Sequence, residues 1–125
     1  MIDEFLQKAG ENLEAARLCF ENALYDASAG RAYFAAFQAA VAALLKAGEQ
    51  HGKFDHKWVQ ATFSEKLIKR RKMFPGRFRA YLIEMQGLRN VADYKRGTIS
   101  KKKAGEQFRR AEEIVAEIGK ELLTC

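Results

Sequence analysis

The chain has 125 residues, of which 48% are hydrophobic and only 1 is proline. This length fits one domain with a substantial core, and the scarcity of proline argues against extended, turn-rich architectures. The formal net charge of +6 favours an anionic partner. The two cysteines, Cys19 and Cys125, lack the spacing of a disulfide framework or a metal motif.

The first predicted helix covers residues 3–24. Apolar residues recur along it at intervals of three and four, which is the periodicity of one helix face. They are Phe5, Leu6, Ala9, Leu13, Ala16, Phe20 and Leu24. Residues 1–4 are acidic and lead directly into this helix, which does not fit a signal peptide and predicts a cytoplasmic protein.

Residues 32–45 form the stretch around which we expect the chain to be organised. Alanine dominates it, and Gln38 is its only strongly polar side chain. A helix that is apolar on nearly all sides must be buried on nearly all sides, whereas this run is too short to cross a bilayer. It is therefore predicted to be the central helix, capped by Asp26 or Ser28 and ended by Gly48.

Within this central helix, Phe34, Phe37, Val41 and Leu44 are predicted to be largely buried. Arg31 and Gln38 are seven residues apart, so they fall on one stripe of the helix. Polar groups on an apolar helix need a partner or line a site. Both are candidate ligand-binding residues.

The second half of the chain predicts three more helices. Asp55 can cap the third helix, which ends in the basic run of residues 69–72, and Pro75 precedes the fourth. The fourth ends at residues 94–97, and Thr98 or Ser100 starts the fifth. No alternating strand pattern is found. Residues 1–125 are thus predicted to form a single all-α domain, an antiparallel bundle of four long helices plus one shorter helix.

Positive charge is concentrated in the middle of the chain. Residues 51–103 hold fifteen of the 22 Lys and Arg residues but four of the 16 Asp and Glu residues. Such a segment suits nucleic-acid phosphates, although a solvated surface would show the same pattern. The candidate phosphate contacts are Lys66, Lys69, Arg70, Arg71, Lys72, Arg77 and Arg79.

Few motifs for catalysis or cofactor binding are present. His51 and His56 are five residues apart, which does not suit one helix face, and no glycine-rich phosphate loop occurs. We therefore predict no metal and no cofactor. On the fourth helix, Arg89 and Asp93 are four residues apart and can pair, with Tyr94 beside them.

Residues 31–40 (Arg-Ala-Tyr-Phe-Ala-Ala-Phe-Gln-Ala-Ala) and 88–94 (Leu-Arg-Asn-Val-Ala-Asp-Tyr) together carry a resemblance. They resemble the S-R-A-Y-Y-A-x-F-x-A-A and L-R-x-x-A-D-Y patterns of the HEPN domain (higher eukaryotes and prokaryotes nucleotide-binding). The compact single-domain prokaryotic branch is the most similar. His56 is similar to the histidine that opens the third helix in many of these proteins.

The resemblance implies a helical bundle that forms a homodimer and binds a nucleotide or RNA phosphate. It implies a minimal nucleotidyltransferase as partner protein, in a toxin–antitoxin-like system without membrane contact. The family's nuclease motif is an arginine followed four to six residues later by histidine. Here Arg89 is followed by Tyr94, and tyrosine, with a pKa near 10, is a poor proton shuttle at neutral pH.

Two functions remain open from the sequence. The first is a binding module that is not an efficient nuclease, with Arg31, Gln38, Arg89, Asp93 and Tyr94 at its ligand site. The second is a metal-independent, toxin-like endoribonuclease that uses Arg31 and Arg89 with either Tyr94 or His56. In that reaction arginine would stabilise phosphate charge, and the second group would transfer a proton to or from the ribose 2′-hydroxyl.

Overall fold

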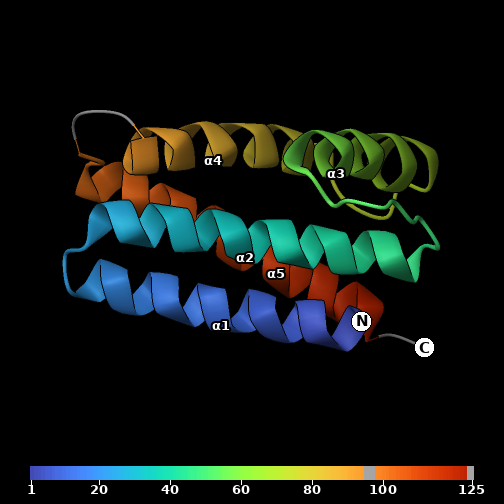
Figure 1. The fold of residues 1–125 in the computed structure, drawn as a ribbon, viewed down its shortest axis with the longest axis horizontal. Coiled ribbons are helices and arrows are strands. Elements are labelled where there is room, and N and C mark those ends of the chain that lie inside the picture. The colour runs from blue at the N-terminus through green and yellow to red at the C-terminus, as the bar shows by residue number, and fades with distance from the viewer. Residues whose placement is uncertain (95–97, 124–125) are drawn as a thin grey trace.

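The computed structural model describes residues 1–94 and 98–123, without the side chain of Tyr94. Its elements are α1 (Ile2–Glu21), α2 (Tyr25–Lys46), α3 (His56–Thr62), η1 (Phe63–Arg70), α4 (Arg77–Tyr94) and α5 (Lys101–Leu122). The π-helical segment η1 continues directly from α3, so the two form one short arm beside four long helices (Figure 1). The predicted all-α bundle of four long helices plus one shorter helix is confirmed.

Helix α2 is the centre of this bundle. It contacts α1, α3, η1, α4 and α5, and in Figure 1 it runs between α1 and α4 with α5 behind it. Every alanine from Ala32 to Ala43 is at most 1% exposed. Because alanine side chains are small, helices can approach α2 closely from several directions. The prediction of a central helix is therefore confirmed.

The four residues of α2 that were predicted to be largely buried differ in how completely they are covered. Val41 and Leu44 are fully buried as predicted, but the largest fully buried side chain is Tyr33. Phe34 and Phe37 are partly buried, and Phe37 packs against the core cluster. They lie on the face of α2 that meets polar side chains of α3 and α4, described below.

The turn between α1 and α2 explains a second difference. Helix α1 ends at Glu21, because Ala23 adopts a left-handed conformation with φ 59°. The N–H of Leu24 donates to the carbonyl of Cys19 (2.8 Å), and that of Ala23 to Phe20 (3.1 Å). This is the Schellman pattern of helix ends. Leu24, predicted on the apolar face, is consequently 57% exposed.

Replacing Ala23 with glycine should stabilise the protein. A left-handed conformation costs an L-residue with a Cβ atom about 1–2 kcal/mol, while glycine loses more backbone entropy on folding. We expect a net gain of about 0.5–1 kcal/mol in the free energy of unfolding, measured by urea denaturation. The reverse substitution, Gly10→Ala in the exposed middle of α1, is the control, and it should also raise the free energy of unfolding because alanine is the better helix former. A loss of stability in Ala23→Gly would contradict the turn geometry.

The predicted helix caps are confirmed in the second half of the chain but not at α2. The side chain of Asp55 accepts from Trp58 N and that of Ser100 from Lys103 N. Asp26 and Ser28, however, lie inside α2, which has no side-chain cap. Their polar atoms have tertiary partners instead: Asp26 Oδ1 accepts from Ile99 N (2.7 Å), and Ser28 Oγ donates to the carbonyl of Ala16 (2.8 Å).

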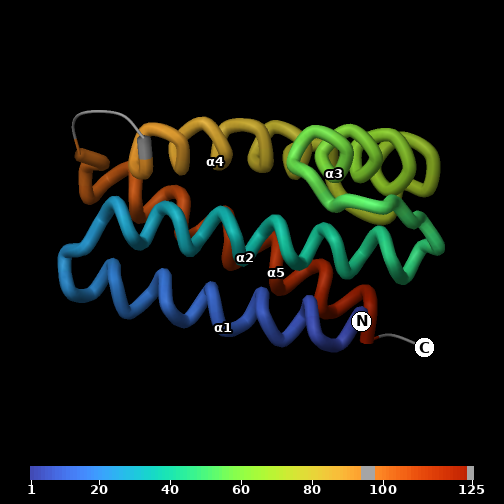
Figure 2. The backbone as a smooth tube through the Cα atoms, viewed as in Figure 1, coloured from blue at the N-terminus to red at the C-terminus, as the bar shows by residue number. Residues whose placement is uncertain are grey.

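The chain path brings the N-terminus beside the end of α5 (Figure 2). Near the other end of α5, buried Gln107 donates through Nε2 to the carbonyls of Ala29 on α2 (3.1 Å) and Met85 on α4 (2.9 Å). One amide thus ties three helices together. Among the helices of the described part of the chain, none has the length and apolarity needed to span a membrane.

Candidate functional site

The partly buried ring of Phe34 is the meeting point of two arginines. The guanidinium carbon of Arg31 lies 5.4 Å from the ring centroid, and that of Arg89, from α4, lies 4.9 Å from it. Both distances are within the range of cation–π attraction. The structure therefore brings together the two arginines that the sequence nominated, although they come from different helices.

Arg89 is oriented by neighbours on its own helix. Its side chain is 14% exposed, and its Nε lies 3.0 Å from Asp93 Oδ2. Nη1 lies 3.4 Å from Asn90 Oδ1. Asp93 also lies against the start of α2, since a Cβ atom placed on Gly30 would be 3.6 Å from its Oδ1. The pair expected from the four-residue spacing is present.

Arg31 is oriented from α1, through a residue that the sequence did not nominate. Its Nη1 donates to Asn12 Oδ1 (3.1 Å), and Asn12 Nδ2 donates to Gln38 Oε1 (2.7 Å). Gln38 therefore reaches Arg31 through Asn12. The stripe of polar residues predicted on the central helix is satisfied by one amide of the neighbouring helix.

His56 packs against the same aromatic face of α2. Its ring centroid lies 4.8 Å from that of Phe37 and 6.4 Å from that of Phe34. Its Nδ1 is 2.7 Å from the hydroxyl oxygen of Tyr33. Gln60 Nε2 donates to this same oxygen (3.2 Å). The Phe34 ring is thus close to both arginines and to the histidine.

The surroundings perturb both titratable groups. Burial, reinforced by the charge of Arg89, lowers the pKa of His56 from its ordinary value, and Asp55 opposes this effect. Burial raises the pKa of Tyr33 to about 12. At neutral pH the phenol is therefore protonated, and it can donate to Nδ1 of a neutral imidazole. In that arrangement the imidazole proton is on Nε2, whereas in the other tautomer Nδ1–H donates to the phenol oxygen.

The stability of the protein should fall as the pH drops below about 6.5, the unfolded pKa of histidine. A lowered pKa in the folded state means that the unfolded chain binds more protons in this range, so acid favours unfolding. His56→Gln should make stability depend less on pH. Thermal melts between about pH 5 and 8, a range that brackets the histidine pKa, measure this change. His51→Gln, at an exposed histidine, is the matched variant; equal flattening in both variants would contradict the assignment to His56.

The basic residues that were predicted to contact phosphates do not lie together in the structure. Lys69 and Arg79 line one hollow between η1 and α4. Arg77 instead binds Glu113 on α5, with Nε 2.8 Å from Oε2, and Arg71 Nη2 donates to the carbonyl of Ala47 (3.3 Å). Arg70 Nε lies 3.9 Å from Glu65 Oε1. Lys66 and Lys72 remain predicted contacts on η1 and the turn after it.

Tyr94 is the last residue of α4, but its side chain lies outside the described residues. Its nomination as a ligand-binding or catalytic residue therefore stays a prediction.

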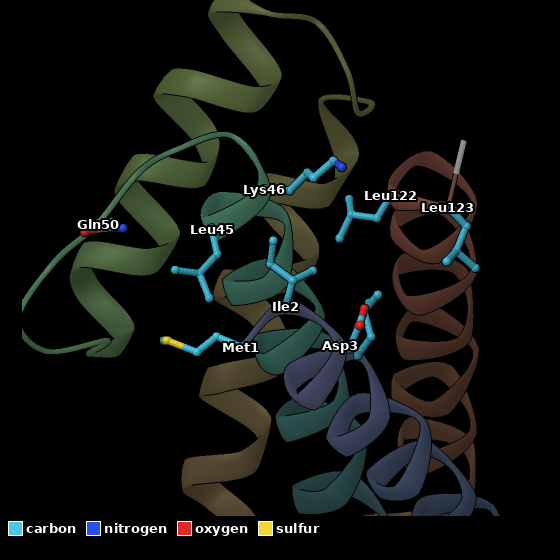
Figure 3. A pocket seen from close by; sticks show the side chains of 9 residues that line it. Met1, Ile2, Asp3, Leu45, Lys46, Gln50, Leu122 and Leu123 are labelled. Carbon is cyan, nitrogen blue, oxygen red and sulfur yellow. The ribbon is translucent and has the colours of Figure 1, made fainter. Parts of the chain in front are cut away.

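A separate hollow of about 460 Å³ lies at the end of the bundle where α1 begins and α5 ends. Figure 3 shows Ile2, Leu45 and Leu122 around it, with Asp3 and Lys46 at its edge. None of the nominated site residues lines it. The arginines and His56 thus lie on a different part of the molecule.

In a comparison with protein-family models, residues 2–122 match a model described as the HEPN domain. No curated protein matches the chain. The resemblance expected from residues 31–40 and 88–94 is thereby confirmed for nearly the whole sequence.

Proposed function

The chain belongs to the HEPN family, and from this premise we propose that it binds the phosphate groups of a nucleotide or an RNA through Arg31 and Arg89. We further propose that it acts as a homodimer in the cytoplasm. Its partner would be a minimal nucleotidyltransferase in a toxin–antitoxin-like system. Family membership supports the homodimer and the partner protein, the sequence of residues 1–4 supports the location, and the arginine site is argued from geometry.

The observation that carries the proposal is the approach of two guanidinium groups to the single ring of Phe34. Guanidinium forms bidentate, charge-assisted hydrogen bonds with phosphate oxygens. Arg31 is exposed, and it uses Nη1 for Asn12, while a guanidinium has five N–H donors in all. Its remaining donors are therefore available to a ligand.

Binding without efficient cleavage follows from the residue at the motif position. Tyr94 stands five residues after Arg89, where the nuclease motif has histidine. A phenol with a pKa near 10 gives up its proton too rarely at neutral pH to act as a good base. We therefore propose a ligand site on a nuclease-like frame.

Incubation of the purified chain with end-labelled single-stranded RNA in excess EDTA tests this proposal. We expect a retarded complex and intact RNA. The logarithm of the binding constant should fall with the logarithm of salt concentration, by about 0.7 for each phosphate contact. Absence of binding at low ionic strength would contradict the proposal, and so would rapid cleavage of the RNA.

A metal-independent endoribonuclease is the second candidate, and the position of His56 favours it. The charge of Arg89 acts on this imidazole, so an arginine and a neutral histidine lie near one aromatic ring although they are far apart in sequence. Arg89 would stabilise phosphate charge, while His56 would transfer a proton at the ribose 2′-hydroxyl. Cleavage in EDTA that is lost in His56→Gln but kept in Tyr94→Phe would support this candidate.

A further inference from the structure

A hollow of about 360 Å³ lies between α3, η1 and α4, and we call it the α3–α4 groove. Its lining residues include Lys57, Gln60, Ser64, Lys69, Arg79 and Ile83. The three cations come from three different elements, α3, η1 and α4. Only Lys69 and Arg79 belong to the contacts nominated from the sequence.

The groove has an excess of positive charge. Glu65 is its one acidic lining residue, and its Oε1 lies 3.9 Å from Arg70 Nε. Among the described residues, no carboxylate lies within 4.0 Å of the charged nitrogens of Lys57, Lys69 or Arg79. These cations are therefore positioned to meet a charge that the described chain does not supply.

Ser64 provides an independent indication of a ligand. It is 6% exposed and lines the groove. Its Oγ is buried and has no hydrogen-bond partner among the described residues. Leaving a buried hydroxyl without a partner is unfavourable. Ser64 lies on η1, and π-helical segments occur often at functional sites.

We propose that the α3–α4 groove binds a phosphate group carried by a nucleotide. Lys57, Lys69 and Arg79 neutralise the phosphate, and Ser64 Oγ donates to one of its oxygens. Ile83, which is 46% exposed, offers an apolar contact to the attached sugar or base. The identity of the ligand as a nucleotide rests on the proposed function, whereas the anion site rests on the groove itself.

Gln60 connects the groove to the site around Phe34. It lines the groove, and its Nε2 also donates to the hydroxyl oxygen of Tyr33 (3.2 Å) and to Gln86 Oε1 (2.6 Å). The groove and the His56 cluster therefore lie on two sides of one side chain. A nucleic-acid strand that binds Arg31 and Arg89 has a second phosphate position within the same molecule.

Nuclear magnetic resonance of the full chain, labelled with nitrogen-15, tests the groove with AMP and with adenosine as the ligand without phosphate. We expect AMP, but not adenosine, to shift the amide signals of Ser64, Lys69 and Arg79. Arg79→Gln should weaken AMP binding about tenfold, and Ser64→Ala about threefold to tenfold. Lys102→Gln, at an exposed lysine of α5, is the charge-matched control and should bind as the wild type does.

The folding of the variants is checked by thermal melting. Ser64→Ala should melt no lower than the wild type, because it removes a buried hydroxyl without a partner. A clear loss of stability would show that the hydroxyl is bound within the protein, and would overturn its role as a ligand donor.

The ligand source follows from a second titration with a single-stranded RNA hexamer. Weaker binding of both AMP and RNA by Arg79→Gln would assign the groove to backbone phosphate, and weaker binding of AMP alone to a free nucleotide. AMP shifts confined to residues around Arg89 and His56 would overturn the groove while leaving the proposed function intact. If Arg89→Gln loses RNA binding but AMP still shifts the amide signals of the groove residues, the groove and the site around Phe34 are two separate binding sites.

Discussion

Leu44→Ala should lower the free energy of unfolding by about 2–5 kcal/mol. Leu44 is 0% exposed on the helix that contacts every other element. Truncation removes buried apolar surface and leaves a cavity that the helices packed on α2 cannot fill without moving. Urea denaturation, followed by the circular dichroism of the helices, measures the loss in the free energy of unfolding. The slope of this free energy against urea concentration should stay unchanged.

Leu24→Ala is the matched control for this experiment. The same side-chain atoms are removed, but Leu24 is 57% exposed in the turn before α2. We expect a change within about 0.5 kcal/mol. If both leucine variants lost the same stability, the arrangement of α2 at the centre and of the α1–α2 turn at the surface would be wrong.

The double variant Arg31→Gln/Arg89→Gln should weaken binding of single-stranded RNA about a hundredfold at constant ionic strength. Each charge-assisted hydrogen bond contributes about 1.5–3 kcal/mol, and 1.4 kcal/mol is tenfold in affinity. Glutamine retains polarity and much of the side-chain length, so packing on Phe34 is changed less than by alanine. Fluorescence anisotropy of a labelled oligonucleotide measures the affinity.

The control removes the same two positive charges elsewhere. Arg109 and Lys102 are both exposed on α5, and Lys102→Gln/Arg109→Gln should weaken binding only through the general electrostatic attraction. A similar loss in both double variants would mean that RNA responds to net charge alone. The salt dependence of the Arg31/Arg89 variant should then be indistinguishable from that of the control.

The features that could be predicted from the sequence alone are those that depend on interactions between residues close together in the chain. The spacing of apolar residues predicts the helices because each buried face depends on residues three and four positions apart. The caps at Asp55 and Ser100 use a backbone N–H three residues ahead, and the pair of Arg89 and Asp93 spans one helical turn. The central position of α2 also follows from the sequence, since an alanine-rich helix with few polar side chains must be covered on nearly all sides.

Tertiary structure decided which polar groups meet. Asp26 and Ser28 read as caps, yet Asp26 binds Ile99 N and Ser28 binds the carbonyl of Ala16, so both partners come from other parts of the chain. A preference for helix starts cannot reveal such partners. Phe34 and Phe37 are partly buried, and tertiary structure places them where α3 and α4 bring polar groups to α2.

The candidate site shows the same division most clearly. Arg31 and Arg89 are far apart in sequence, and only the packing of α4 on α2 places both over Phe34. The sequence offered His56 only as an alternative, and the hydroxyl of Tyr33 beside it was not nominated, although Tyr33 lies two residues after Arg31. Periodicity determines which side of a helix is apolar, whereas contacts between helices depend on their relative rotation and crossing, which no single segment encodes.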